Sequence, residues 1–80
     1  MKRVYIQYFA MLREKSNIEK EELETKAVTY ADLYNELNHK YEFDLPLSMI
    51  QIAVNDEYID KSREVIDGAR IVFIPPVAGG

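Results

Sequence analysis

Residues 29–41 carry the pattern that most constrains the fold of this chain. Their apolar side chains recur at the spacing i, i+3, i+4, i+7 and i+11, which places them on one face of a helix: Tyr30, Leu33, Tyr34, Leu37 and Tyr41. Thr29 can cap this helix, and Asp32 completes a capping box three residues later. An amphipathic helix has to bury its apolar stripe against another layer. The remainder of the chain must therefore provide one apolar surface that covers this helix.

Other segments alternate between apolar and polar residues with the period of two that is typical of β-strands. We predict strands over residues 2–10, 18–26, 48–55, 58–59 and 70–74, a turn of helix over 11–15 and a turn over 55–57. Alternation predicts one buried face, to which six residues contribute: Val4, Ile6, Ile52, Val54, Ile71 and Phe73. It directs Phe9, Val72 and Ile74 to the opposite, outer face.

The acidic segment of residues 18–26 is open to two interpretations. Charged side chains at the edge of a sheet prevent pairing with other chains, which favours an edge strand. Glu and Lys are also good helix formers, so a helix remains the alternative. We expect the carboxylates of Glu19, Glu21, Glu22 and Glu24 to form a solvated face and not a metal site.

Together these elements predict an α+β fold with two layers. A mixed sheet of about five strands forms one layer, and the helix of residues 29–41 packs across one face of it, with Leu33 and Leu37 in contact with the sheet. Eighty residues suffice for one domain with a small core, so we assign residues 1–80 to a single domain.

Composition argues against several kinds of site and partner. The chain has no cysteine, which excludes disulfides, cysteine-bound metals and a persulfide on the chain itself. Its net charge of −4 disfavours nucleic acid and anionic membrane surfaces as partners. No apolar run could span a bilayer and no signal peptide is evident, so we expect a cytoplasmic protein. The only histidine, His39, has no identifiable catalytic partner, and no common catalytic motif is present.

The last eight residues, 73–80, read Phe-Ile-Pro-Pro-Val-Ala-Gly-Gly. Pro75 and Pro76 cannot donate ladder hydrogen bonds, so they end any strand that precedes them. Gly79 and Gly80 have no side chains and can lie extended in a channel too narrow for other residues. We expect residues 75–80 to protrude as a tail, with 77–80 flexible until a partner binds them. The alternative is a frayed chain end without a function.

Three stretches together resemble the small, sulfur-carrying subunit of molybdopterin synthase, within the ubiquitin-like β-grasp proteins. They are Tyr-Phe-Ala-Met-Leu-Arg-Glu at residues 8–14, Ala-Val-Asn at 53–55, and the tail at 73–80. The resemblance covers essentially the whole chain. It implies the β-grasp fold for the predicted sheet and helix.

The resemblance also implies a mechanism in which Gly80 carries the reacting group. An activating enzyme that uses ATP and magnesium adenylates the carboxylate of Gly80, and a sulfur donor protein then converts it to a thiocarboxylate. The charged tail enters a large catalytic subunit, in a heterotetramer, and passes sulfur to a pterin precursor to form the dithiolene of the molybdenum cofactor. On this reading the chain binds no cofactor or metal and is not an enzyme by itself.

Partner contacts in that family lie on the sheet around the tail, and by resemblance they fall on Phe9, Tyr58 and Ile74 here. Arg13, Val77 and Ala78 are further candidate contacts. The alternative for Phe9 is ordinary core packing. Other functions also remain open: a sulfur carrier for the thiamine thiazole or for transfer-RNA thiolation, a ubiquitin-like modifier joined to lysines, or a pure interaction domain. The Pro-Pro-Val-x-Gly-Gly ending favours the molybdopterin pathway.

Overall fold

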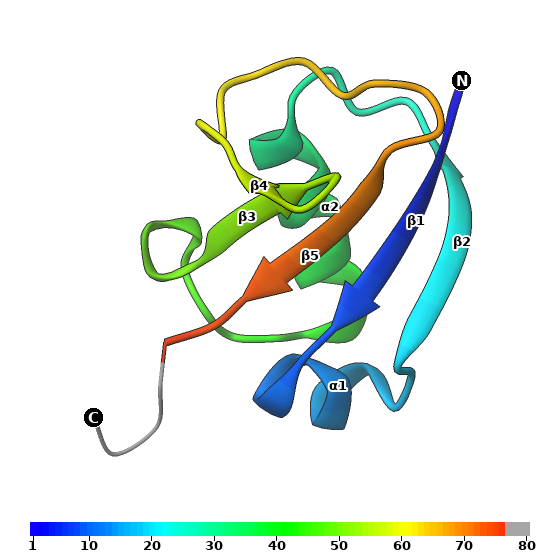
Figure 1. Cartoon of the computed structure of the whole chain (residues 1–80). Coiled ribbons are helices and arrows are strands. Elements are labelled where there is room, and N and C mark those ends of the chain that lie inside the picture. The colour runs from blue at the N-terminus through cyan, green and yellow to red at the C-terminus, as the bar shows by residue number, and fades with distance from the viewer. Residues whose placement is uncertain (77–80) are drawn as a thin grey trace.

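The computed structural model describes residues 1–76, and the alternating segments of the sequence form one five-stranded mixed sheet in it (Figure 1). The elements along the chain are β1 (Lys2–Tyr8), α1 (Ala10–Ser16), β2 (Lys20–Thr25), α2 (Tyr30–Tyr41), the 3₁₀ turn η1 (Leu47–Met49), β3 (Gln51–Val54), β4 (Glu57–Tyr58) and β5 (Arg70–Ile74). The strand order is β2-β1-β5-β3-β4. The two central strands, β1 and β5, are parallel, and every other neighbouring pair is antiparallel.

Helix α2 lies across one face of this sheet, as the helical stripe predicted (Figure 1). Thr29 accepts a hydrogen bond from the backbone N–H of Asp32, and the carboxylate of Asp32 accepts one from the backbone N–H of Thr29. This capping box fixes the start of the helix. Leu33 and Leu37 are fully buried together with the predicted inner face of the sheet. The α+β fold and the assignment of the inner face are therefore confirmed.

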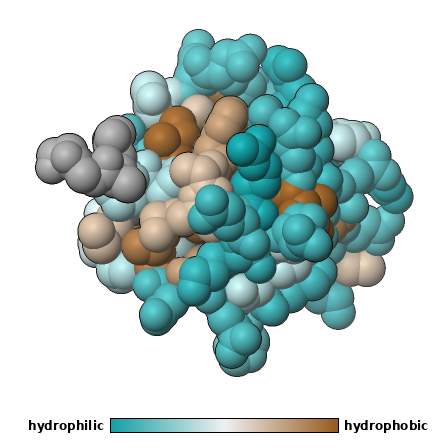
Figure 2. All heavy atoms as spheres, turned by 90° about the horizontal axis from the view of Figure 1, so that it is seen from below, coloured by the Kyte–Doolittle hydropathy of each residue, from teal (hydrophilic) through white to brown (hydrophobic). Residues whose placement is uncertain are grey.

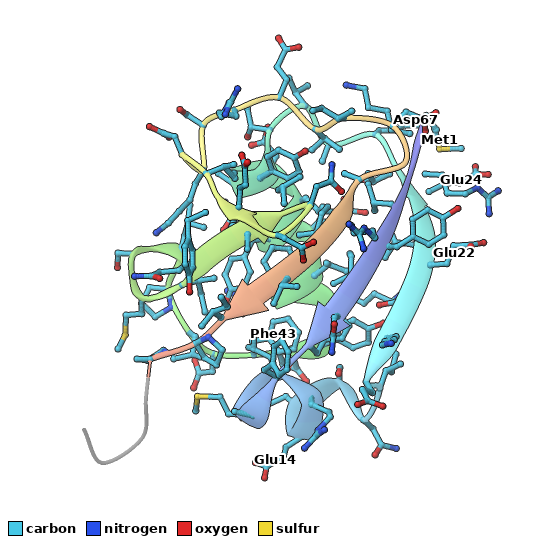
Figure 3. The ribbon with its side chains drawn as sticks, in the orientation of Figure 1. Met1, Glu14, Glu22, Glu24, Phe43 and Asp67 are labelled. Carbon is cyan, nitrogen blue, oxygen red and sulfur yellow. The ribbon has the colours of Figure 1, made fainter. Side chains whose placement is uncertain are left out.

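The acidic segment is a strand, so the helical alternative is wrong. β2 pairs antiparallel with β1 over six residues and forms one edge of the sheet. Arg3 of β1 reaches across to the exposed carboxylates of Glu22 and Glu24, with N–O distances of 2.6 and 2.8 Å. These three side chains explain why a charged segment is stable here, because opposite charges on neighbouring strands attract each other. Glu22 and Glu24 lie along this edge in Figure 3.

The prediction of a strand over residues 48–55 was wrong at its start. Residues 47–49 form the turn η1, closed by hydrogen bonds from the backbone N–H of Met49 to the carbonyl of Pro46 and from Ile50 to Leu47. This turn carries the chain into the core, where Ile50 is fully buried. The strand itself begins only at Gln51.

The hairpin after β3 is also shorter than predicted. Asn55 and Asp56 both have positive φ, of 51° and 73°, as the two central residues of a tight type I′ hairpin require. Glu57 therefore pairs directly with Val54, and β4 covers Glu57–Tyr58 instead of residues 58–59. The turn has two residues, and not the three that the sequence suggested.

Aromatic rings fill the core beneath the carboxyl ends of β1 and β5. Tyr8 and Phe73, which are paired in register, have ring centroids 6.4 Å apart. Phe43 packs against Tyr8 at 5.7 Å, and Tyr34 of α2 packs against Phe73 at 5.4 Å. Figure 3 shows Phe43 at this end of the sheet. Within residues 1–76, no helix has the length and apolarity that crossing a membrane would require.

Candidate functional site

The parallel pairing of β1 and β5 decides where the chain leaves the sheet. Tyr8 lies beside Phe73, so both central strands end at the same edge, and α1 follows β1 there (Figure 1). Pro75 is buried, and Pro76 is the first exposed residue after the strand. The exposed part of the predicted tail therefore begins at Pro76. Val77, Ala78, Gly79 and Gly80 lie outside the described residues, so the predictions for them stay predictions.

Strand register defines which side chains share the outer face near this exit. Gln7 lies beside Val72, Val72 beside Ala53, and Ala53 beside Tyr58, which makes one row across four strands. Directly paired residues project on the same side of a sheet. In the next row towards the exit, Ile74 lies beside Gln51, and Phe9 follows Tyr8 in extended conformation.

The structure thus places Phe9 and Ile74 at the ends of adjacent strands, with Tyr58 two strands further along the same face. Phe9 is 42% exposed and Tyr58 is 70% exposed, while Ile74 is half-buried. The exposure of Phe9 contradicts the alternative of core packing. We call Phe9, Ala53, Tyr58, Val72 and Ile74 the docking patch.

Two members of the docking patch, Ala53 and Val72, were not among the predicted partner contacts. Both lie between Ile74 and Tyr58 and make the apolar surface continuous. Alternation had already directed Val72 outward, so the sequence contained a signal for it. Ala53 belonged to a predicted strand as well, but its small side chain gave no reason to single it out.

Arg13 is directed towards β2 and not towards Pro76. Its guanidinium lies 3.7 Å from the carboxylate of Glu19, just before β2, and both side chains are more than half exposed. β2 and β5 lie on opposite sides of β1. Arg13 is therefore on the β2 side of the exit, and the structure does not group it with Ile74 and Tyr58.

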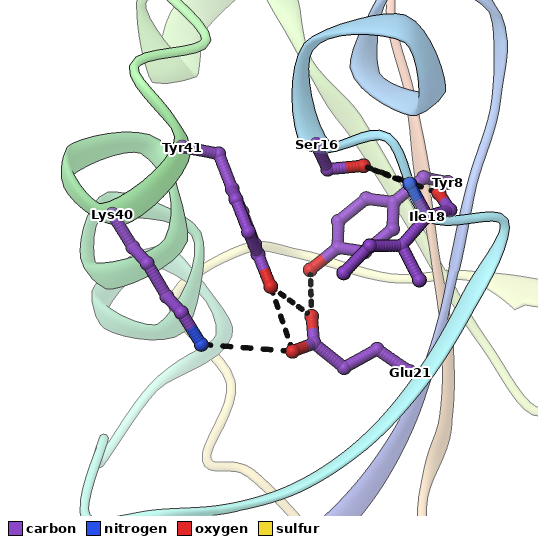
Figure 4. Close-up of polar contacts among 6 residues, drawn as sticks. All are labelled: Tyr8, Ser16, Ile18, Glu21, Lys40 and Tyr41. Atoms are coloured by element: carbon purple, nitrogen blue, oxygen red, sulfur yellow. Dashed lines mark hydrogen bonds and ion pairs between the residues drawn. The ribbon is translucent and has the colours of Figure 1, made fainter.

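A cluster of polar groups joins the inner side of β1 to β2 and α2 (Figure 4). The hydroxyls of Tyr8 and Tyr41 both donate to the carboxylate of Glu21, at 2.8 and 2.7 Å. Lys40 lies 3.6 Å from the same carboxylate, whose side chain is only 14% exposed. Burial raises the pKa of Tyr8 far above its ordinary value, and the hydrogen bond to Glu21 raises this pKa further. The same two causes raise the pKa of Tyr41. Both hydroxyls therefore remain donors at neutral pH and tie β2 and α2 to β1.

The outer face of the described chain has a shallow groove and no cluster of metal-ligating side chains. Among residues 1–76, no three side chains of His, Cys, Asp or Glu come together as a metal site would require. A shallow groove of about 630 Å³ on the outer face is lined by Tyr5, Gln7 and Val72 and by charged side chains such as Lys20 and Arg70. Arg70 faces Asp56 at 3.4 Å, and both are largely exposed.

A parallel central pair, a single crossing helix and an exit beside an apolar outer patch define the class: a ubiquitin-like β-grasp protein of the sulfur-carrier type. The chain belongs to the ThiS family, whose sequence model matches residues 6–80. No significant match is found among curated protein sequences.

Solved structures agree with this assignment. A Pyrococcus furiosus protein designated molybdopterin converting factor subunit 1 is 27% identical, with a TM-score of 0.78 over 96% of this chain and 100% of that one. Subunit 1 in the complex of subunits 1 and 2 of molybdopterin-converting factor from Helicobacter pylori is 28% identical, with a TM-score of 0.65 over 98% and 99%. The ubiquitin of Caldiarchaeum subterraneum is 16% identical, with a TM-score of 0.65 over 99% and 98%, and supports the fold alone.

Proposed function

We propose that this chain is the sulfur-carrier subunit of a molybdopterin synthase. The observation that carries the proposal is the position of the exit: the chain leaves the centre of the sheet beside an exposed apolar patch and continues through Pro75 and Pro76 to a Gly-Gly end. The two relatives that are more than 25% identical and bear the name of molybdopterin converting factor support the same pathway.

The chemistry consists of one substitution at phosphorus, which activates the carboxylate of Gly80, and one acyl substitution at the carbonyl carbon of Gly80. First, a carboxylate oxygen attacks the α-phosphorus of ATP, and pyrophosphate leaves. Then a sulfur nucleophile attacks the acyl carbon of the mixed anhydride, AMP leaves, and a thiocarboxylate remains. Because an ionised carboxylate is a poor electrophile, an activating enzyme with ATP and magnesium has to perform the first step. A sulfur donor protein supplies the nucleophile for the second.

The docking patch holds the carrier on its partners while the tail reacts. Phe9 and Tyr58 present large rings, and large rings are the side chains that most often dominate binding between proteins. The principal partner is the large catalytic subunit, in a heterotetramer, and the complex of subunits 1 and 2 of molybdopterin-converting factor from Helicobacter pylori supports this choice. The tail residues Val77, Ala78 and Gly79 would lie in the partner's channel that leads Gly80 to the pterin precursor. The reaction would take place in the cytoplasm.

Mass spectrometry of the carrier tests the proposal. The chain is incubated with the activating enzyme, ATP, magnesium and a sulfide source, and it should gain about 16 Da as sulfur replaces one oxygen of the Gly80 carboxylate. A variant with one residue added after Gly80 is the control and should gain nothing, because its reacting carbon is shifted by about 3.5 Å. Equal gain by the extended variant, without proteolytic trimming, would refute the proposal.

A second measurement separates the molybdopterin pathway from other uses of the same tail. The thiocarboxylate form is mixed with the large subunit and a pterin precursor, and dithiolene formation is followed. Sulfur that is accepted only by a thiazole or transfer-RNA enzyme would assign the carrier to one of those pathways. Isopeptide bonds between Gly80 and lysines of other proteins would instead identify a protein modifier.

A further inference from the structure

Two methionines lie in the segments that flank the exit. Met11 is the second residue of α1, which begins directly after β1, and Met49 ends η1, two residues before Gln51. β1 and β3 are the two neighbours of β5 in the sheet. Figure 1 shows α1 and the loop before β3 on either side of the point where the chain leaves β5.

Both methionine side chains are exposed to solvent, Met11 by 36% and Met49 by 48%. Together with Phe9 and Ile74 they belong to the segments that flank the exit, and we call these four residues the exit collar. Figure 2 looks onto this end of the molecule and shows brown and tan apolar atoms gathered on the side where the described chain ends. Exposed apolar side chains that occur singly need no explanation, but a contiguous group usually marks a contact with another molecule.

The length of the tail forces any enzyme that acts on Gly80 to approach the exit collar. In the proposed function, on which this inference rests, the reacting carbon lies four residues beyond Pro76. Four extended residues span at most about 14 Å. An active site that receives Gly80 must therefore open within about 14 Å of Pro76. Such an enzyme therefore comes close to the end of the sheet where Met11 and Met49 are exposed.

Of the two proposed steps, adenylation creates the intermediate that water can destroy. Water that attacks the acyl carbon of the adenylate expels AMP, releases a proton and regenerates the carboxylate, so that ATP is consumed without gain of sulfur. The productive attack by the sulfur nucleophile expels AMP from the same carbon. Excluding water from a closed active site prevents this kind of side reaction.

We propose that Met11 and Met49 seal the exit collar against the apolar rim of the activating enzyme's tail channel and thereby keep water from the adenylate. Methionine is suited to this role because its unbranched, polarisable side chain adapts to irregular surfaces. The seal continues the docking patch through the residues they share, Phe9 and Ile74. It acts on the fate of the intermediate and not on the chemistry of Gly80.

The test compares the AMP released with the thiocarboxylate formed when the activating enzyme, ATP, magnesium and sulfide are supplied. The double variant Met11→Gln and Met49→Gln keeps the size and the unbranched shape of both side chains but makes them polar. We expect it to raise the ratio of AMP to thiocarboxylate at least about threefold, while the initial rate of pyrophosphate release stays within about twofold. The conservative variant Met11→Leu and Met49→Leu should keep the wild-type ratio.

Ile66→Gln is a matched control, because Ile66 is apolar and 59% exposed but belongs to the loop at the amino end of β1. It should leave the ratio unchanged. An unchanged ratio in the glutamine variant, even with slower turnover, would overturn the seal and leave the proposed function intact. A wild-type chain that gains no sulfur would overturn the proposed function, and the seal with it. A raised ratio of AMP to thiocarboxylate in both double variants would also overturn the seal, because the leucine variant retains an apolar collar.

Discussion

At the scale of single residues, the backbone and the side chain of Phe9 have separate roles. Its carbonyl accepts hydrogen bonds from Leu12 and Arg13 at the start of α1, and its backbone is extended. The ring contributes to neither of these features and remains 42% exposed. Replacing the ring should therefore leave the helix start intact and affect only what binds the outer face.

We expect Phe9→Ala to weaken binding to the large subunit by more than about 1 kcal/mol, because the ring is the largest apolar group beside the exit. Tyr5→Ala is the matched control, since Tyr5 is an aromatic residue on the outer face of β1 with 41% exposure, but lies away from the exit. Calorimetric titration measures both affinities, and thermal unfolding checks the fold. Equal losses for both variants would argue against a localised docking patch.

Single-residue predictions from sequence succeeded where alternation alone decides the direction of a side chain. Phe9 and Ile74 were assigned to the outer face in this way, and the structure agrees. Met49 could not be recognised, because its segment had been predicted as a strand and it lies in a turn. Arg13 was assigned by resemblance, and its direction depends on Glu19, a pairing that spacing in the sequence does not reveal.

At the scale of elements, α2 packs against the inner face of the sheet and stabilises the carboxyl ends of β1 and β5. Leu37 of α2 is 1% exposed and lies in the same cluster as Phe73 and Tyr8. Leu37→Ala should lower the free energy of unfolding by about 2–5 kcal/mol, because it removes buried methyl groups and leaves a cavity. Urea unfolding measures the loss. A loss below about 0.5 kcal/mol would show that the helix contributes little to this end of the core.

The buried tyrosines predict how stability depends on alkaline pH. Burial raises the pKa of Tyr34, whose hydroxyl donates to the carbonyl of Leu45, to about 12. In the unfolded chain tyrosine ionises near pH 10, so above that pH the unfolded state binds fewer protons than the folded state. The contribution of Tyr34 is therefore complete below about pH 10 and is lost as the pH rises to about 12.

Tyr34→Phe should make the fall of unfolding free energy between pH 10 and 12 less steep, by at most about 1.4 kcal/mol per pH unit. Urea titrations at several pH values measure the slope for both proteins. Below about pH 9 the two slopes should coincide, because tyrosine is protonated in both states there. Identical slopes over the whole range would mean that Tyr34 ionises as readily in the folded chain as in the unfolded one.

Whole elements could be predicted where the local pattern and the tertiary packing agree. The helix of residues 29–41 and the strand of 70–74 were located to within one residue, because periodicity and end signals coincide there. The start of β3 was missed, because burial of Ile50 requires a turn that interrupts an otherwise β-like run. The parallel pairing of β1 and β5, which places the exit, joins residues far apart in the chain, and no local pattern in the sequence predicted it.

At the scale of the whole molecule, the buried core and the proposed docking patch lie on opposite faces of one sheet. The inner face packs against α2 (Figure 1), and strand register places the patch on the outer face beside the exit. Because Phe9 and Ile74 of the patch lie at the ends of the two central strands, the patch has a fixed position relative to Pro76. The reach from the patch to Gly80 is then limited by the number of residues after Pro76.

This arrangement predicts that tail length matters more for sulfur transfer than for binding. Inserting one alanine between Pro76 and Val77 would displace the Gly80 carbon by about 3.5 Å relative to the docking patch. A misplacement of about 1 Å can already cost on the order of 10²-fold in rate. We therefore expect the insertion to slow sulfur transfer to the pterin precursor by at least about 10²-fold, with a much smaller loss of affinity for the large subunit.

Deleting Ala78 from the chain with the insertion restores the original length and provides the decisive comparison. If the docking patch and the tail length together place the reacting carbon, this chain should recover transfer to within about tenfold of wild type, although its tail sequence has changed. Single-turnover transfer from preformed thiocarboxylate measures the rate without the activating enzyme. Wild-type transfer by the chain with the insertion alone would show that the partner selects the position of Gly80 independently of the docking patch.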